Sequence, residues 1–109
     1  MRKYFFSVLF LIASLSAFGQ IEVIHYNAGW NSANDVSWFD DLEDCDIKSV
    51  DIAAKPNEKA KHQVVVVPTI IVFQDGEEVK RFQADLSFKI AFTREELQDY
   101  IDELVMSAF

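Results

Sequence analysis

Few side chains in this sequence can do chemistry, and they are widely spaced. The chain has one cysteine, Cys45, and two histidines, His25 and His62. Two histidines without a third ligand at useful spacing do not make a zinc site. The acidic residues between positions 40 and 46 lack the alternating oxygen ligands and central glycine of a calcium loop. We therefore expect no metal, no cofactor and no catalytic residue.

Cys45 is the one candidate thiol. A single cysteine cannot form a disulfide within the chain, and a lone cysteine is most often buried as a small apolar side chain. Reactive thiols need nearby positive charge or a helix N-terminus that favours the thiolate. Cys45 instead lies between Asp44 and Asp46, near the C-terminal end of an expected helix. These neighbours predict a raised pKa and an unreactive thiol.

Residues 1–19 have the layout of a secretory signal peptide. Two basic residues, Arg2 and Lys3, are followed by an uncharged apolar run from 4 to 18. The sequence Ala-Phe-Gly then places small residues at the −3 and −1 positions of a cleavage site before Gln20. The run is about 15 residues long, shorter than the roughly 20 of a stable membrane span. This predicts export, to the periplasm or the extracellular space. An uncleaved N-terminal anchor is the alternative.

Cleavage would leave an acidic domain of residues 20–109. The whole chain has 10 basic and 18 acidic residues and a net charge of −8, so losing Arg2 and Lys3 would leave 8 basic residues and a charge of −10. Such a charge repels nucleic acid and anionic lipid surfaces. We expect no nucleic-acid partner and no stable membrane insertion of the mature domain. With 50% hydrophobic and 14% aromatic residues, the composition predicts one packed globular domain.

The apolar pattern alternates between strand and helix in the order β-α-β-α-β-β-α. The expected strands are residues 21–27, 47–52, 69–73 and 78–84, and the expected helices are residues 32–44, 53–62 and 93 to the C-terminus. The first helix is predicted because three apolar residues, at 36, 39 and 42, recur at helical spacing. Asp75-Gly76 predicts a tight hairpin turn, and Thr93 and Glu96 have the spacing of a capping box. A β-α-β unit and a hairpin together predict a mixed sheet with helices on both faces.

Two segments resemble the thioredoxin family. His25–Trp30 reads His-Tyr-Asn-Ala-Gly-Trp, which is similar to the family's Asp-Phe-Trp-Ala-x-Trp approach to its active site. Val67–Thr69, with the strand and Asp-Gly turn that follow, is similar to the family's Ile-Pro-Thr loop, strand and Asn-Gly-Glu turn. The resemblance covers residues 21–106. It implies a thioredoxin-like α/β fold, a mixed central sheet flanked by helices, and a cis Val67–Pro68 bond beside the active-site tip.

The same resemblance marks what this chain lacks. It places Asn31 and Asn34 at the positions of the family's two active-site cysteines. Thiol–disulfide exchange needs a thiolate to attack a disulfide sulfur, which an amide cannot do, so we expect no dithiol redox activity. His25 replaces the family's buried acid, and residues 85–92 are an insertion.

The resemblance also implies a groove at the tip that binds a protein or peptide partner. Its expected residues are Trp30, Asn31, Ser32, Asn34, Val67, Pro68 and Thr69. For Asn31 and Asn34, simple helix capping is the alternative interpretation. For His25, a pH-sensitive group and a satisfied buried residue are the two alternatives.

Two other functions stay open at this point. One is a weak thiol–disulfide oxidoreductase, or a mixed-disulfide acceptor, that uses Cys45. The other is a structural accessory subunit that uses the insertion 85–92, in which Phe88, Ile90 and Phe92 form a partner-binding patch. These three side chains can instead fold back over the core. Exposure of Cys45 and of the insertion's apolar residues distinguishes these alternatives.

Overall fold

The structure is a computed structural model that describes residues 20–107. The predicted signal peptide, residues 1–19, lies outside the described residues. Gln20, which follows the predicted cleavage site, is the first residue described. Among residues 20–107, the helices are all too short or too polar to cross a membrane.

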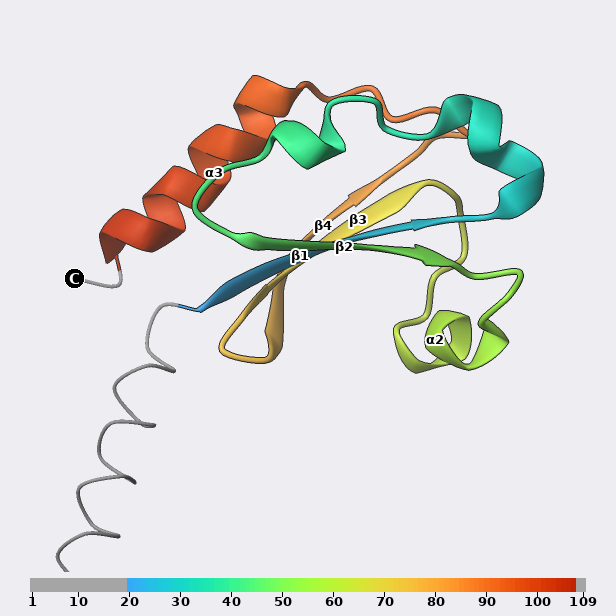
Figure 1. Cartoon of the computed structure of the whole chain (residues 1–109), viewed down its shortest axis with the longest axis horizontal. Helices are drawn as coiled ribbons and strands as arrows, with labels where there is room; N and C mark the ends of the chain where they lie inside the picture. Colours follow the sequence, from blue (N-terminus) through green and yellow to red (C-terminus); the bar gives the residue numbers. More distant parts are fainter. Residues whose placement is uncertain (1–19, 108–109) are drawn as a thin grey trace, which may run out of the picture.

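A four-stranded sheet with the order β2-β1-β3-β4 forms the centre of the domain (Figure 1). Strands β1 (Ile21–Asn27) and β2 (Asp46–Asp51) are parallel. Strand β3 (Thr69–Gln74) is antiparallel to β1, and β4 (Glu77–Gln83) is antiparallel to β3. The predicted mixed sheet is confirmed, and the strand bounds differ from the predicted ones by about a residue, which is the usual uncertainty of strand and helix ends.

The two inner strands are buried on both of their faces. Ile70, Ile71 and Val72 of β3 are fully buried, as are Val23 and Tyr26 of β1. Runs of β-branched residues of this kind are typical of strands that are covered on both sides. The covered inner strands therefore form the rigid part of the domain from which the loops project.

The β3–β4 turn has the predicted geometry. Asp75 and Gly76 have φ angles of 53° and 87°, and a tight hairpin turn of this type needs positive φ at both central residues. Gly76 adopts such an angle without the steric cost that a side chain brings. The Asp-Gly turn is thus confirmed.

Helices cover both faces of the sheet (Figure 1). On one face, α3 (Arg94–Ser107) packs Leu97 and Ile101 into a cluster with Phe39 and Leu42. The backbone N–H of Glu96 donates to Thr93 Oγ1 over 3.2 Å, so the first half of the predicted capping box is present. On the other face lies a cluster made of Ile24, Tyr26, Ala28, Val50, Ile52, Val64, Val67, Ile71 and Phe73.

The short helix α2 (Pro56–Lys61) covers this second face without burying any residue of its own. Pro56 occupies its first turn, where a missing N–H costs nothing. The His62 ring that follows the helix packs on Tyr26 and Phe73, with ring centroids 5.8 and 5.4 Å away. The helix is shorter than the predicted range 53–62.

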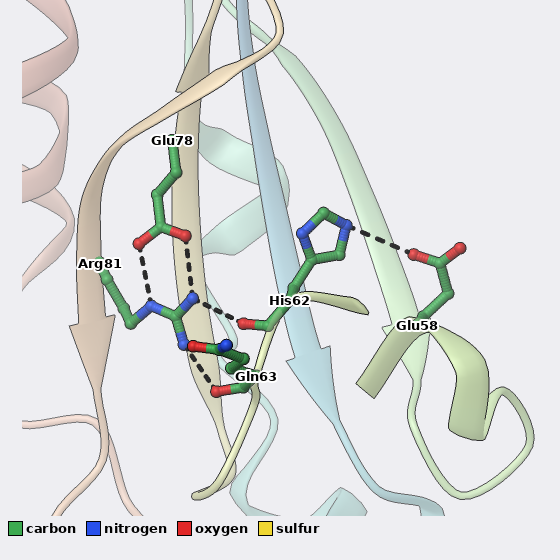
Figure 2. Close-up of polar contacts among 5 residues, drawn as sticks. All are labelled: Glu58, His62, Gln63, Glu78 and Arg81. Carbon is green, nitrogen blue, oxygen red and sulfur yellow. Dashed lines mark hydrogen bonds and ion pairs between the residues drawn. The ribbon is translucent and has the colours of Figure 1, made fainter. Parts of the chain in front are cut away.

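A guanidinium group joins α2 to the edge of the sheet (Figure 2). Arg81 of β4 donates to the backbone carbonyl oxygens of His62 and Gln63 over 2.6 and 3.0 Å. The same group donates to both carboxylate oxygens of Glu78, over 2.8 and 3.0 Å. These bonds satisfy carbonyls beyond the helix end, which otherwise lack partners. Arg81 therefore fixes a helix that has little apolar anchorage.

The predicted α-helix over residues 32–44 is wrong. Two short 3-10 helices, η1 (Gly29–Asn34) and η2 (Phe39–Asp41), occupy this region. The inward-facing residues were predicted correctly, because Phe39 and Leu42 are buried and Val36 packs beside them. Their spacing of three fits the 3-10 period better than the α-helical period of 3.6.

Candidate functional site

Two loops meet at one end of the sheet and form the tip of the domain. Helix η1 follows β1 directly, and the cis Val67–Pro68 bond directly precedes β3. Because β1 and β3 are antiparallel, with Tyr26 paired to Thr69, the end of one strand lies beside the start of the other. This pairing brings Trp30 and Val67 to the same place.

A mostly apolar hollow of about 170 Å³ lies between these loops, and we call it the apolar hollow. Its apolar lining comes from Ala28, Trp30, Ile52, Ala53, Val65, Val66, Val67 and Phe88, and Lys59 also lines it. Trp30 is 69% exposed and Val65 is 79% exposed. Large apolar side chains thus gather, open to solvent, around one concave surface.

Only part of the predicted groove contributes to this hollow. Trp30 and Val67 line it, whereas Pro68 and Thr69 are fully buried. The Thr69 hydroxyl donates to the carbonyl oxygen of Val66 over 2.6 Å. Pro68 and Thr69 therefore shape the loop from below, and their side chains do not reach the surface.

Asn31 is buried beneath the tip at the centre of an amide network. Its Nδ2 donates to Asn27 Oδ1 over 3.0 Å and to the carbonyl oxygen of Phe88 over 3.3 Å. Its Oδ1 accepts from Asn34 Nδ2 over 2.8 Å. In return, Asn27 Nδ2 donates to the backbone oxygen of Asn31 over 3.1 Å and to the carboxylate of Asp35. The network satisfies these buried amides, which are costly when unpaired.

The capping interpretation of Asn31 and Asn34 is therefore wrong. Ala28 is the N-cap residue of η1, and no side chain caps this helix. The two amides instead bind to each other, and Asn31 also binds to a strand and to the insertion. Asn31 lies below the surface with 6% exposure, so its amide is not presented to solvent.

The insertion 85–92 reaches both the tip and the core. The Phe88 ring stands edge-on to Trp30, with centroids 5.5 Å apart. Phe92 packs on Phe82 and Trp38, at 4.4 and 5.7 Å, and so folds back against the α3 side of the core. Phe88 has a φ angle of 61°, a region that non-glycine residues seldom occupy. Phe88 belongs to the tip surface, whereas Phe92 is partly buried and packs against the core.

A second hollow, of about 350 Å³, shares Ala28 with the first, and we call it the acidic cleft. Its polar lining comes from His25, Asn27, Ser32, Asp35, Ser49 and Asp51. Asp51 Oδ1 accepts from the backbone N–H groups of Gly29 and Ala53 over 3.2 and 2.9 Å. Ser32, which was predicted in the groove, therefore faces this cleft and not the apolar hollow.

His25 forms the buried wall of the acidic cleft. Only 5% of its surface is exposed, and its ring packs on Phe39 at 5.2 Å. Its Nδ1 lies 3.4 Å from Ser49 Oγ, and its Nε2 has no hydrogen-bond partner among residues 20–107. Burial lowers the pKa of His25 from 6.5, although the carboxylates of Asp35 and Asp40 oppose this shift. The imidazole is therefore neutral near pH 7.

Cys45 is far from the tip. It lies in a bend between η2 and β2, not at the C-terminus of a helix as predicted, and it is half-buried. Burial, followed by the charges of Asp46 and Asp44, raises the pKa of its thiol to about 11. Strand β2 separates Cys45 from the tip, and six residues at roughly 3.3 Å each span about 20 Å.

His25 and His62 do not come together. The first packs on Phe39 on the α3 side of the sheet, and the second packs on Tyr26 and Phe73 on the α2 side. Within residues 20–107, no three His, Cys, Asp or Glu side chains are grouped to hold a metal ion.

The solved structures that this domain resembles include thioredoxins. A mutant thioredoxin from Halobacterium salinarum NRC-1 superposes with a TM-score of 0.63 at 19% identity, over 79% of this chain and 75% of that one. A thioredoxin from Fasciola hepatica gives a TM-score of 0.54 at 17% identity, over 94% of both chains. A designed protein gives 0.59 at 19% identity, over 89% of this chain and 91% of that one. The sequence matches no protein-family model and no curated protein. The chain thus has a thioredoxin-like fold.

Proposed function

We propose that this protein is an exported thioredoxin-like domain that binds a protein or peptide partner at the apolar hollow and does not catalyse dithiol exchange. One observation carries the proposal. Trp30, Val65 and Phe88 are exposed apolar side chains that gather around a single concave surface. Scattered exposed apolar residues are ordinary, but a contiguous group beside a hollow is typical of a binding site, and tryptophan is enriched among residues that dominate binding energy.

The chemistry of the tip supports the second half of the proposal. The positions that the resemblance assigns to the redox cysteines carry Asn31 and Asn34, whose amides are engaged with each other. The one thiol, Cys45, has a pKa of about 11. At neutral pH about one such thiol in ten thousand is a thiolate, the species that attacks disulfides. An exposed apolar surface without a reactive thiol is suited to binding a partner.

Capture of a partner tests the binding proposal. Tagged wild-type protein and a Trp30→Ser variant are used as bait in an extract of the native envelope, and retained proteins are identified by mass spectrometry. Met106→Ser is the matched control, because Met106 is 76% exposed on α3 and lines neither hollow. We expect the wild type and Met106→Ser to retain the same protein and Trp30→Ser to lose it. Equal retention by Trp30→Ser would refute the binding site.

Reduction of insulin disulfides in the presence of dithiothreitol tests the absence of redox activity. We expect no turnover above background, because neither Asn31 nor Asn34 can form the mixed disulfide. Turnover that disappears in a Cys45→Ser variant would support the thiol function through Cys45 instead. Turnover that survives in Cys45→Ser would contradict the proposal altogether.

A further inference from the structure

We infer that the partner segment is an extended peptide with an apolar residue beside an arginine or lysine, the first seated in the apolar hollow and the second in the acidic cleft. This inference rests on the proposed function and names the chemistry of the partner.

The two hollows lie on opposite faces of the sheet at the ends of β1 and β2, because His25 lines the cleft on the α3 side and Ile52 lines the hollow on the α2 side. We call the strand ends between them the ridge. Both hollows are lined by Ala28, and the residues that follow β1 and β2 separate them. Gly29 lines the cleft without a side chain, and a Cβ at this position would lie 3.1 Å from Asp51 Oδ2. Successive side chains of an extended peptide point to opposite sides. A peptide that runs along the ridge therefore sends neighbouring side chains into the two hollows.

The charges of the two hollows select different side chains. Asp35 and Asp51 line the acidic cleft, and neither forms an ion pair with any of residues 20–107. Lys59 lines the apolar hollow and repels a second cation there. A basic side chain is thus favoured in the cleft and disfavoured in the hollow, so the charges decide which of the two side chains enters which hollow.

His25 gives an independent indication that the cleft receives a ligand. More than nine-tenths of this side chain is buried in the wall of the cleft, and its Nε2 has no partner within the described part of the chain. A buried polar atom without a hydrogen bond is uncommon in folded proteins. A neutral imidazole also leaves the two carboxylates without a cationic partner among residues 20–107. These carboxylates favour a ligand with several N–H donors, as arginine has.

An NMR titration with capped peptides tests the inference. The ¹⁵N-labelled protein is purified from the exported fraction of cells that express the full chain. The probes are acetyl-Gly-Ala-Leu-Arg-Ala-Gly-amide and the same peptide with Gln or Glu in place of Arg. We expect the Arg peptide to shift the Trp30 indole together with the Asp35 and Asp51 amides. We expect it to bind about fivefold more tightly than the Gln peptide, the upper range for an exposed ion pair.

Charge-removing variants provide the control. Asp35→Asn keeps an oxygen that can accept from Asn27, and Asp35→Asn/Asp51→Asn removes both cleft charges. The preference for Arg over Gln should shrink in the first and disappear in the second. Asp99→Asn, an exposed site on α3, should leave it unchanged.

The outcomes separate this inference from the proposed function. Equal affinity for the three peptides, with shifts confined to the apolar hollow, would overturn the basic-residue inference and leave partner binding intact. Absence of binding by all three peptides at about millimolar concentration, the weak end of measurable affinity, would also overturn the inference. The capture experiment with Trp30→Ser decides the proposed function independently.

Discussion

At the scale of single residues, Asn31 determines the character of the tip. Its side chain holds β1, η1 and the insertion together through Asn27, Asn34 and the carbonyl of Phe88. A cysteine thiol is too weak a donor and acceptor to make such a network. Asn31, which the resemblance places at the position of the family's first active-site cysteine, therefore links three segments of the tip through its amide.

Replacing Asn31 by alanine should destabilise the domain. The change leaves Asn27 Oδ1, Asn34 Nδ2 and the Phe88 carbonyl without the Asn31 side chain as a partner. An unsatisfied buried group costs about 1–3 kcal/mol. We expect the free energy of unfolding to fall by at least about 2 kcal/mol in urea titrations. Asn34→Ala removes one bond of the network and should cost about 1 kcal/mol. Wild-type stability in Asn31→Ala would contradict the network.

His25 should make the stability depend on pH. Its pKa is lowered in the folded state, first by burial and against the charges of Asp35 and Asp40. The unfolded chain then binds the proton more readily, so the free energy of unfolding falls as the pH drops below about 6.5. We expect a smaller loss of stability between about pH 7.5 and pH 5.5 in His25→Gln than in the wild type. Equal losses in both proteins would show that His25 is not the group responsible.

At the scale of elements, α2 depends on Arg81. The helix buries none of its residues, and Arg81 supplies its polar link to β4 (Figure 2). We expect Arg81→Ala to speed amide hydrogen exchange in residues 56–63 and to lower the free energy of unfolding by about 1.5–3 kcal/mol, the usual range for bonds of a charged donor. Arg81→Lys should recover little, because an ammonium group cannot reproduce the bidentate geometry. Unchanged exchange in this segment would rule out the link.

Strands and the last helix were predictable because their signals are local. The β-branched runs, the Asp-Gly turn and the Thr93 cap each act within a few residues. The structure of residues 32–44 was not predictable from local signals, because Asn31, just before it, binds to the carbonyl of Phe88, 57 positions away. Asparagine, serine and aspartate also compete with the helix by binding to nearby backbone groups. The contact between Asn31 and Phe88 therefore favours short 3-10 helices here, whereas the apolar spacing predicted only which residues face inward.

The candidate site was predicted in the same uneven way. Trp30 and Val67 lie together as the resemblance implied, but Pro68 and Thr69 are buried. Val65 was not predicted in the site. Four consecutive valines before a proline could have indicated it, because side chains of a strand alternate and not all four can face the core. Asp35 and Asp51 were also missed, because the cleft that joins them forms only when η1 and β2 are in place.

At the scale of the whole molecule, the sequence predicts a processed and exported protein. In a secretory signal peptide, a basic start, an apolar run and a small-residue site of this kind are read by the export machinery. We expect N-terminal sequencing of the exported fraction to begin at Gln20. Replacing Ala17 and Gly19 by larger residues should block cleavage and leave the precursor. Detection of an intact Met1 on protein that stays in the cytoplasm would overturn the predicted localisation.

The insertion 85–92 contacts both tryptophans, Trp30 and Trp38, so its movement can be followed by intrinsic tryptophan fluorescence. Phe88 lies against Trp30, which is open to solvent, and Phe92 lies against Trp38, which is half-buried. Fluorescence from an indole in water is shifted to the red of fluorescence from an indole in an apolar setting. Displacement of the segment from the tip thus alters the longer-wavelength emission of Trp30. Detachment of the segment from the core alters the shorter-wavelength emission of Trp38. A single unlabelled sample reports which end of the segment moves when a partner arrives.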